Sequence, residues 1–211
     1  MTSSTIAIPA AHPDDQILVD FVLGELHQCR RVLVEAHLSF CAQCRMRVEE
    51  LSRPASAFIE SVPDIAPPDA LWASLAAQLD GERDASPADV LADTPMPVGA
   101  RGELPRRTMP LDWLPQGDSE ISLIAGDEQE EFSLFLVRTP PELYFPYHVH
   151  LGGEEIVILT GGYTDDYGHL GTGDFRSYAA GSAHGPRMDP GEVCWALALI
   201  IGGVEMGEAP G

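Results

Sequence analysis

The sequence predicts an α + β multidomain protein, in which a small all-α domain is followed by an all-β barrel. Between residues 14 and 80 apolar residues recur at helical spacing, whereas short β-rich runs separated by Gly, Pro and Asp follow residue 110. The stretch between them lacks periodicity and is rich in Pro, Gly, Ala and charge, which is typical of a linker. We therefore place a helical domain at 1–84, a linker at 85–109 and a β domain at 110–211.

Two helices are expected at the start of the helical domain. Ile17, Leu18, Phe21 and Val22 recur at the spacing of one helix face, which predicts a first helix after residue 14. The same spacing between residues 32 and 40 predicts a second helix. Strand patterns are nearly absent from this part of the chain, so an all-α domain is the expected result.

Two further helices complete that domain. The third is expected from about Ala42 to Arg53, because Pro54 disfavours continuation of a helix. The fourth corresponds to PPDALWASLAAQLD, with Asp69 at its start and Gly81 after its end.

The second half is predicted to be a small antiparallel barrel or sandwich. Short runs rich in β-branched and aromatic residues are separated by turn residues throughout it. The clearest runs are ISLIAG, EFSLFLVRTP, EEIVILTGGY, DFRSYAAG and CWALALIIGG.

The chain is strongly acidic, with 33 Asp and Glu residues against 12 basic residues and a net charge of −21. This balance argues against direct binding to nucleic acid or to an anionic membrane, because both require a basic surface. It is compatible with a cationic partner, or with acidity that only maintains solubility. No apolar run approaches the ~20 residues of a membrane span, and the start lacks the features of a signal peptide, so a cytoplasmic location is expected.

A first candidate metal site lies in the helical half. His37, Cys41 and Cys44 stand at i, i+4 and i+7, so their side chains can converge on one helix face or across a helix end. One imidazole and two thiolates suit zinc, and His12, just before the first helix, is the best fourth donor. The alternative is that these residues only pack in the core. The nearby Cys29 has no place in this pattern.

The four residues of this candidate site belong to a segment that resembles a known domain family. The segment from His12 through H-x3-C-x2-C at residues 37–44 resembles the zinc-binding anti-sigma domain over about residues 10–80. The resemblance implies that His12, His37, Cys41 and Cys44 bind Zn²⁺. It also implies that the domain binds an extracytoplasmic-function sigma factor in a 1:1 complex and keeps that factor off RNA polymerase.

A second candidate metal site lies in the β half. In PYHVHLGGEE, His148 and His150 project to the same side of a strand, and His184 ends the later run GTGDFRSYAAGSAH. The two segments resemble the two cupin motifs, with Ala179 where the second motif usually has proline. Three imidazoles and one carboxylate make a divalent metal site, with Zn²⁺ favoured and Fe, Mn or Ni also compatible.

The carboxylate ligand of this second site is either Glu154 or Glu155, because strand alternation turns only one of them inward. The shorter spacing from His150 favours Glu154. Cys194, on an apolar strand, is expected to be a core residue, and His169 a solvated turn residue.

A zinc anti-sigma domain joined to a cupin resembles the ChrR family of anti-sigma factors, and the resemblance spans nearly the whole chain outside the linker. It implies a regulator that is not an enzyme, in which the cupin domain is needed for the response to singlet oxygen or organic hydroperoxide. The alternative is a cupin dioxygenase or isomerase, in which Arg138, Tyr147 and Tyr163 would orient a small molecule.

Overall fold

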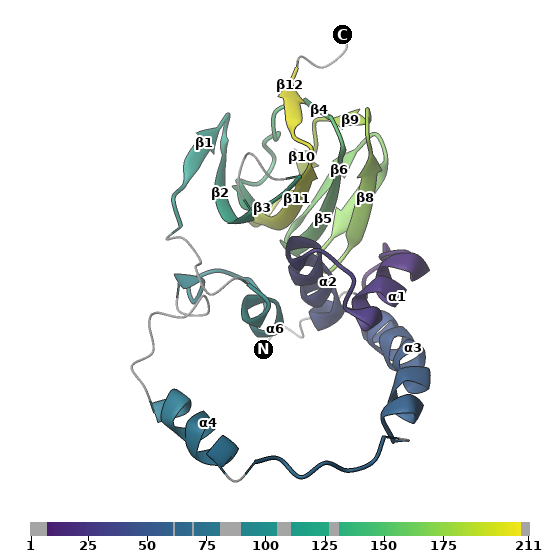
Figure 1. Ribbon diagram of the computed structural model, residues 1–211. Helices are drawn as coiled ribbons and strands as arrows, with labels where there is room; N and C mark the ends of the chain where they lie inside the picture. Colours follow the sequence, from purple (N-terminus) through teal and green to yellow (C-terminus); the bar gives the residue numbers. More distant parts are fainter. Residues whose placement is uncertain are drawn as a thin grey trace, which may run out of the picture.

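The computed structural model describes residues 8–60, 62–68, 70–80, 90–104, 111–126 and 131–207. Helices from the first half of the chain lie below a β barrel built from the second half (Figure 1), as the sequence predicts. The helices are α1 (Asp15–Leu23), α2 (Gln28–Phe40), α3 (Ala42–Glu60), α4 (Ala70–Asp80) and α6 (Val98–Gly102).

The strands form three sheets. The largest has the order β1-β2-β3-β11-β5-β8, and the two smaller ones have the orders β10-β6-β7 and β12-β4-β9. All strand pairs are antiparallel, which agrees with the predicted barrel. The strands are β1 (Leu114–Gln116), β2 (Ser119–Gly126), β3 (Phe132–Thr139), β4 (His148–His150), β5 (Gly153–Thr160), β6 (Gly162–Asp165), β7 (Gly168–Gly171), β8 (Phe175–Ala179), β9 (Ala183–His184), β10 (Arg187–Met188), β11 (Cys194–Ile201) and β12 (Val204–Met206).

The first two helices begin and end at residues whose side chains explain the boundaries. The Asp14 carboxylate accepts a hydrogen bond from the Ile17 amide at 2.8 Å and so caps α1. Gly24 ends that helix in the left-handed conformation, with φ of 75°. His27 caps α2 through its Nδ1, which accepts from the Cys29 amide at 3.3 Å.

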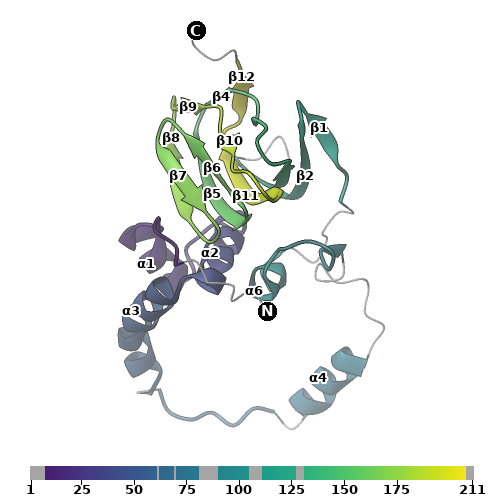
Figure 2. The same cartoon turned by 180° about the vertical axis from the view of Figure 1, so that it is seen from behind.

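The sequence predicts that the third helix stops before Pro54, and this prediction is wrong. The helix continues to Glu60 with the proline inside it. Proline removes one backbone hydrogen bond from a helix interior without forbidding the helix, so favourable neighbours can carry the helix through it. The prediction of the fourth helix is confirmed by α4, although its expected flanks Asp69 and Gly81 lie outside the described residues. This helix stands apart from the other helices and from the barrel in Figures 1 and 2.

The large sheet has a hydrophobic core on each face. In β5, Ile156 and Ile158 belong to the cluster inside the barrel, whereas Val157 and Leu159 belong to the cluster shared with the helices. β11 alternates in the same way. Strands buried on both faces are rich in apolar residues, which explains the long apolar runs IVIL in β5 and ALALII in β11.

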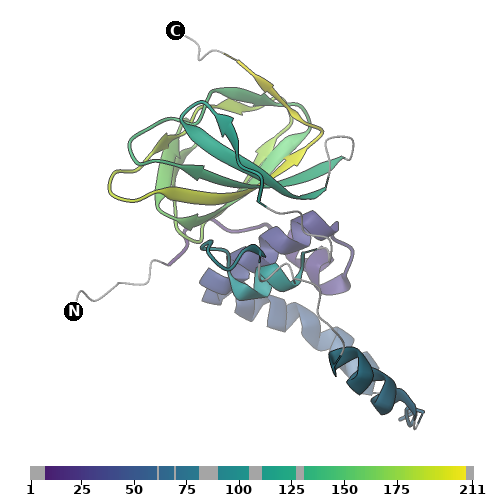
Figure 3. The same ribbon diagram turned by 90° about the vertical axis from the view of Figure 1, so that its left-hand side faces the viewer.

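The helix α2 is the centre of the shared core. Val32, Leu33, Val34 and Ala36 are fully buried, and the cluster that contains them also includes Leu134, Leu136 and Leu199 from the barrel. Figure 3 shows the helices against one side of the barrel. Complete burial of side chains such as Val and Leu stabilises a fold by about 1.5–3 kcal/mol each, so the helical and β halves support one another.

Part of the predicted linker is packed rather than extended. Within the described residues 90–104, the side chains of Leu91, Met96, Ala100 and Leu104 are buried in the core cluster that contains α2. Isolated apolar residues in a segment rich in Pro and Gly give no periodic pattern, which is why composition alone indicated a linker.

Candidate metal centres

The structure brings together the four residues that the sequence predicts as zinc ligands. His12 lies just before α1, His37 in the last turn of α2, Cys41 at the junction of α2 and α3, and Cys44 in the first turn of α3. Their candidate ligand atoms all lie within 4.8 Å of one another. The site therefore forms across a helix end, which is one of the two arrangements that the spacing allowed.

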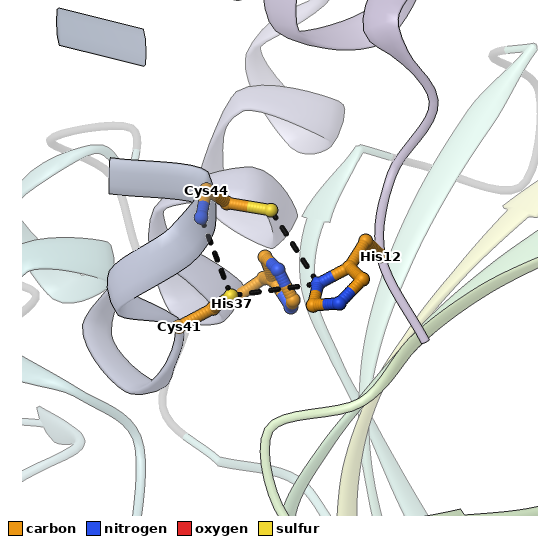
Figure 4. Close-up of side chains that lie close together, drawn as sticks. All are labelled: His12, His37, Cys41 and Cys44. Atoms are coloured by element: carbon orange, nitrogen blue, oxygen red, sulfur yellow. Dashed lines mark hydrogen bonds between the residues drawn. The ribbon is translucent and has the colours of Figure 1, made fainter. Parts of the chain in front are cut away.

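His12 faces both sulfur atoms (Figure 4). Its Nδ1 lies 3.4 Å from Cys41 Sγ and 3.5 Å from Cys44 Sγ. The Cys44 amide donates to Cys41 Sγ at 3.4 Å, so the backbone of α3 also fixes that sulfur.

His37 is oriented by the barrel. Its Nδ1 donates to the Gly173 carbonyl at 2.7 Å, and its buried Nε2 has no hydrogen-bond partner among the residues that the structure describes. Burial, the largest effect, lowers the pKa of His37 to about 4, so the imidazole is neutral at physiological pH. A neutral, buried ring with an unpaired Nε2 is ready to bind a metal ion.

The donor set of this site fits zinc. Two sulfur and two nitrogen donors are the ligands of tetrahedral structural zinc sites. Burial, followed by the neighbouring Cys41, raises the pKa of Cys44 to about 12. A bound dication would stabilise the thiolates that burial disfavours.

The second predicted site is also assembled, inside the barrel. His148 and His150 lie on β4, Glu154 on β5 and His184 on β9, and all four side chains are buried. Glu154 Oε2 lies 3.2 Å from His150 Nε2 and 3.3 Å from His184 Nε2, and the Nε2 atoms of His148 and His184 are 3.2 Å apart. The candidate ligand atoms again lie within 4.8 Å of one another.

Each of these three histidines is held by its Nδ1. His148 Nδ1 donates to the Pro146 carbonyl at 2.8 Å. His150 Nδ1 donates to Ser182 Oγ at 3.0 Å, and His184 Nδ1 donates to the Asp165 carboxylate at 2.8 Å. Hydrogen bonding at Nδ1 leaves every Nε2 directed at the common centre, an arrangement typical of histidines that bind metals.

Two acidic groups, Glu154 and Asp165, stabilise positive charge at the centre. Although burial opposes ionisation, the neighbouring His150 and His184 rings hold the pKa of Glu154 at about 2. Burial lowers the pKa of His184, but Asp165 and Glu154 outweigh this effect and raise it to about 9. An ionised carboxylate among three imidazoles fits a divalent metal, and this nitrogen and oxygen donor set is compatible with Zn, Fe, Mn or Ni.

The two adjacent glutamates point to opposite faces of β5. Glu154 faces the barrel interior with the histidines, whereas Glu155 forms an ion pair with Arg30 of α2 at 2.8 Å. The geometry therefore brings Glu154, and not Glu155, to the second centre.

An apolar cavity of about 230 Å³ opens onto the barrel site. His148, Glu154 and His184 line it on one side, and most of the remaining wall is apolar, including Ile156 and Met188. Because a cavity of about 150 Å³ holds benzene, this cavity has room for a small organic molecule beside the metal ligands.

Other residues that the sequence singled out fall outside both centres. Cys29 and Cys194 are buried, as expected for core residues, and burial raises the pKa of Cys194 to about 12. His169 is exposed and pairs with Asp189 at 2.8 Å. Of the three residues that the enzyme alternative would use, only Tyr163 is among the described residues that line the cavity. Tyr147 is not among them, and Arg138 lies over the Trp113 ring and pairs with Glu120.

Several site residues were not identified from the sequence. Asp165 and Ser182 hold ligands of the barrel site, and Gly173 holds His37 of the helical site. They lie far from their ligands along the chain, on turns and strand ends, so no spacing pattern indicates them.

Comparisons with known proteins cover both halves of the chain. Residues 103–199 match the family described as the ChrR cupin-like domain. The chain is 28% identical over 187 residues to the anti-sigma-E factor ChrR of Cereibacter sphaeroides, covering 89% of this chain and 87% of that protein. These matches confirm the resemblance to ChrR-type anti-sigma factors.

The solved structure of Rhodobacter sphaeroides SigE in complex with the anti-sigma ChrR is similar with a TM-score of 0.66 and 25% identity, covering 90% of this chain and 98% of that chain. A cupin-like protein from Ralstonia eutropha matches 46% of this chain and 66% of its own, with 16% identity and a TM-score of 0.41. Among the described residues, no helix has the length and apolar character that crossing a membrane requires.

Proposed function

We propose that this chain, which resembles ChrR in both its helical and its cupin part, is an anti-sigma factor. It binds an extracytoplasmic-function sigma factor in a 1:1 complex in the cytoplasm and keeps it off RNA polymerase. The similar protein from Cereibacter sphaeroides is named an anti-sigma-E factor, and the similar solved chain is an anti-sigma factor in complex with SigE.

The observation that carries this proposal is the exposed apolar surface of α4. Leu71, Trp72 and Leu75 lie within one turn of one another on this helix, and all three are exposed, Trp72 by 73%. The helix stands away from the shared core (Figure 2). Exposed aromatic and aliphatic side chains on an isolated helix are typical of a surface that a protein partner covers.

Charge supports the same class of partner. A sigma factor binds DNA and must present basic surfaces, whereas this chain has a net charge of −21 and contains no lysine. Complementary charge accelerates and orients such an encounter, while the apolar residues of α4 supply the contact.

Zinc in the helical site is structural in this proposal. It joins the segment before α1 to the junction of α2 and α3. It therefore fixes the relative positions of the three helices that precede α4 in the chain. When bound there, Zn²⁺ supplies folding free energy to this region.

The cupin domain is the receiver of the signal. A metal held by His148, His150, Glu154 and His184 would stand at the end of the 230 Å³ apolar cavity, where singlet oxygen or an organic hydroperoxide can reach it. Such an oxidant can release the sigma factor only by changing the relative free energies of the bound and released states.

Co-expression with candidate extracytoplasmic-function sigma factors tests the anti-sigma role. The chain should co-purify with one of them as a 1:1 complex, and Trp72→Glu should weaken that complex by at least about tenfold, as expected for an aromatic anchor. Leu114→Glu is the matched control, because Leu114 is an exposed apolar residue on the barrel. Failure to bind any such sigma factor would contradict the proposal, and full binding by Trp72→Glu would exclude α4 as the contact.

A sigma-dependent reporter tests the receiver role. Cells that carry His148→Ala, His150→Ala or His184→Ala should keep the sigma factor inhibited with and without singlet oxygen or an organic hydroperoxide. His169→Ala is the control, because this histidine is exposed and outside the cluster. Normal induction in all three variants, at wild-type protein levels, would assign the cupin a purely structural role.

A further inference from the structure

The candidate zinc site of the helical half is contacted by a turn of the barrel. The turn before β8, residues 171–175, lies against the segment that carries His12 and against the end of α2. This contact joins positions that are 163 and 164 residues apart in the chain.

Asp174 fixes the segment before His12. One carboxylate oxygen accepts from the amides of Ala10 and Ala11 at 2.5 and 2.9 Å, and the other accepts from the Gly171 amide at 2.7 Å. The Phe175 amide then donates to the Ala11 carbonyl at 3.0 Å. The backbone immediately before His12 is therefore held by a buried carboxylate and a strand end of the barrel.

Gly173 fixes the second imidazole. Its carbonyl accepts the Nδ1 proton of His37, which leaves Nε2 for the metal. Its φ is +88°, and a Cβ at this position would come within 2.7 Å of Phe40 Cβ and 2.8 Å of Pro9 Cγ. Only glycine allows both this backbone conformation and this close approach.

From these contacts we infer that the barrel turn 171–175 is the outer support of the helical zinc site, with Asp174 as a positioning residue for His12 and the Gly173 carbonyl as the orienting acceptor for His37. The barrel thereby sets the affinity of a site to which it contributes no ligand. The inference rests on the metal assignment in the proposed function, but not on the identity of the protein partner.

Zinc affinity of the full-length chain, measured by competition with a chromophoric chelator, tests this inference. Asp174→Ala should weaken binding at the helical site by about 10–100-fold, the usual cost of losing an outer partner of a metal ligand. Asp174→Glu, which keeps the charge but displaces the oxygens, should also weaken it. Asp189→Asn is the control, because Asp189 binds the exposed His169.

Gly173→Ala is an independent variant, because it alters the His37 contact without removing a charge. It should lower zinc affinity and change the visible spectrum of the Co²⁺-substituted site, which reports the ligand geometry directly. The cupin metal content of every variant shows whether the barrel has folded, and only variants that keep it are compared.

Wild-type zinc affinity in Asp174→Glu and in Gly173→Ala would overturn the inference, as would loss of the cupin metal in every variant at these two positions. Unchanged zinc content in Cys41→Ser and His37→Ala would instead overturn the metal assignment. Because no sigma factor enters these measurements, a failure of the anti-sigma proposal leaves their interpretation intact.

Discussion

Glu154 and Glu155 have different environments because consecutive residues of a strand point to opposite faces of the sheet. Glu154 shares the barrel interior with three histidines, and Glu155, one residue later, meets Arg30 of α2. A strand alternates its side chains between two faces, and in β5 both faces are buried. The barrel site and the contact between the two halves of the chain are thus built on consecutive residues.

The first prediction separates the roles of these two residues. Glu154→Gln should remove about one equivalent of metal from the full-length chain, because it removes the charged ligand of the barrel site. Glu155→Gln should keep that metal and lose only the ion pair with Arg30. Metal analysis of both purified variants provides the measurement, and retention of full metal content by Glu154→Gln would contradict the assignment.

Spacing along the chain predicted all eight residues that the structure gathers into two clusters. His37, Cys41 and Cys44, for example, lie within eight residues, so helical geometry alone restricts where their side chains can meet. The partners Asp165, Gly173 and Asp174 could not be predicted, because tertiary folding brings them from remote turns. The choice between Glu154 and Glu155 needed the orientation of β5, which a local motif only suggests.

At the scale of the elements, α3 shows how a sequence rule can be outweighed. Pro54 lies inside the helix, where it cannot donate a backbone hydrogen bond and leaves the Glu50 carbonyl without its usual donor. The helix nevertheless continues to Glu60, so the surrounding residues compensate for a local cost of up to about 3 kcal/mol.

The second prediction concerns this proline. Pro54→Ala should stabilise the last turns of α3 by about 2–3 kcal/mol, because it restores a hydrogen bond and removes a steric conflict. Amide hydrogen exchange over residues 48–58 should slow by at least about tenfold. Arg53→Ala is the control for a nearby exposed position, and equal exchange in wild type and Pro54→Ala would contradict the prediction.

The third prediction concerns the junction of α2 and α3. Removing zinc with a chelator should accelerate amide exchange in residues 8–13 and 41–47, because the metal is expected to connect these two segments. α4 provides an internal reference, since it lies away from the site (Figure 1). Exchange that stays the same in both segments after verified zinc loss would mean that packing alone holds the junction.

At the scale of the molecule, the boundary between the halves is less simple than the composition suggested. The buried face of α2 shares one core with barrel residues such as Leu134 and Leu199, and Leu91 and Met96 from the expected linker belong to the same core. Periodicity identified the helices and strands well, but it contains no information on which apolar faces meet each other.

The fourth prediction follows from this shared core. A chain of residues 1–104 should unfold at a higher temperature than residues 1–84, because the segment around α6 covers part of α2. Both should bind zinc more weakly than the full-length chain, which retains the support of residues 171–175. Thermal unfolding and chelator competition check the two statements, and equal stability of the two fragments would contradict the first.

The strand β8 lies next to the surroundings of both candidate metal centres. It follows Asp174 directly, and it contains Tyr178, whose hydroxyl donates to the same Asp165 carboxylate that holds His184 of the barrel site. If metal binding at one centre shifts this strand, the free energy of coupling must be equal in both directions. If the barrel metal changes the zinc affinity of the helical site by some factor, zinc must change the metal affinity of the barrel site by the same factor. Removing either ion would then lower or raise the affinity for the other.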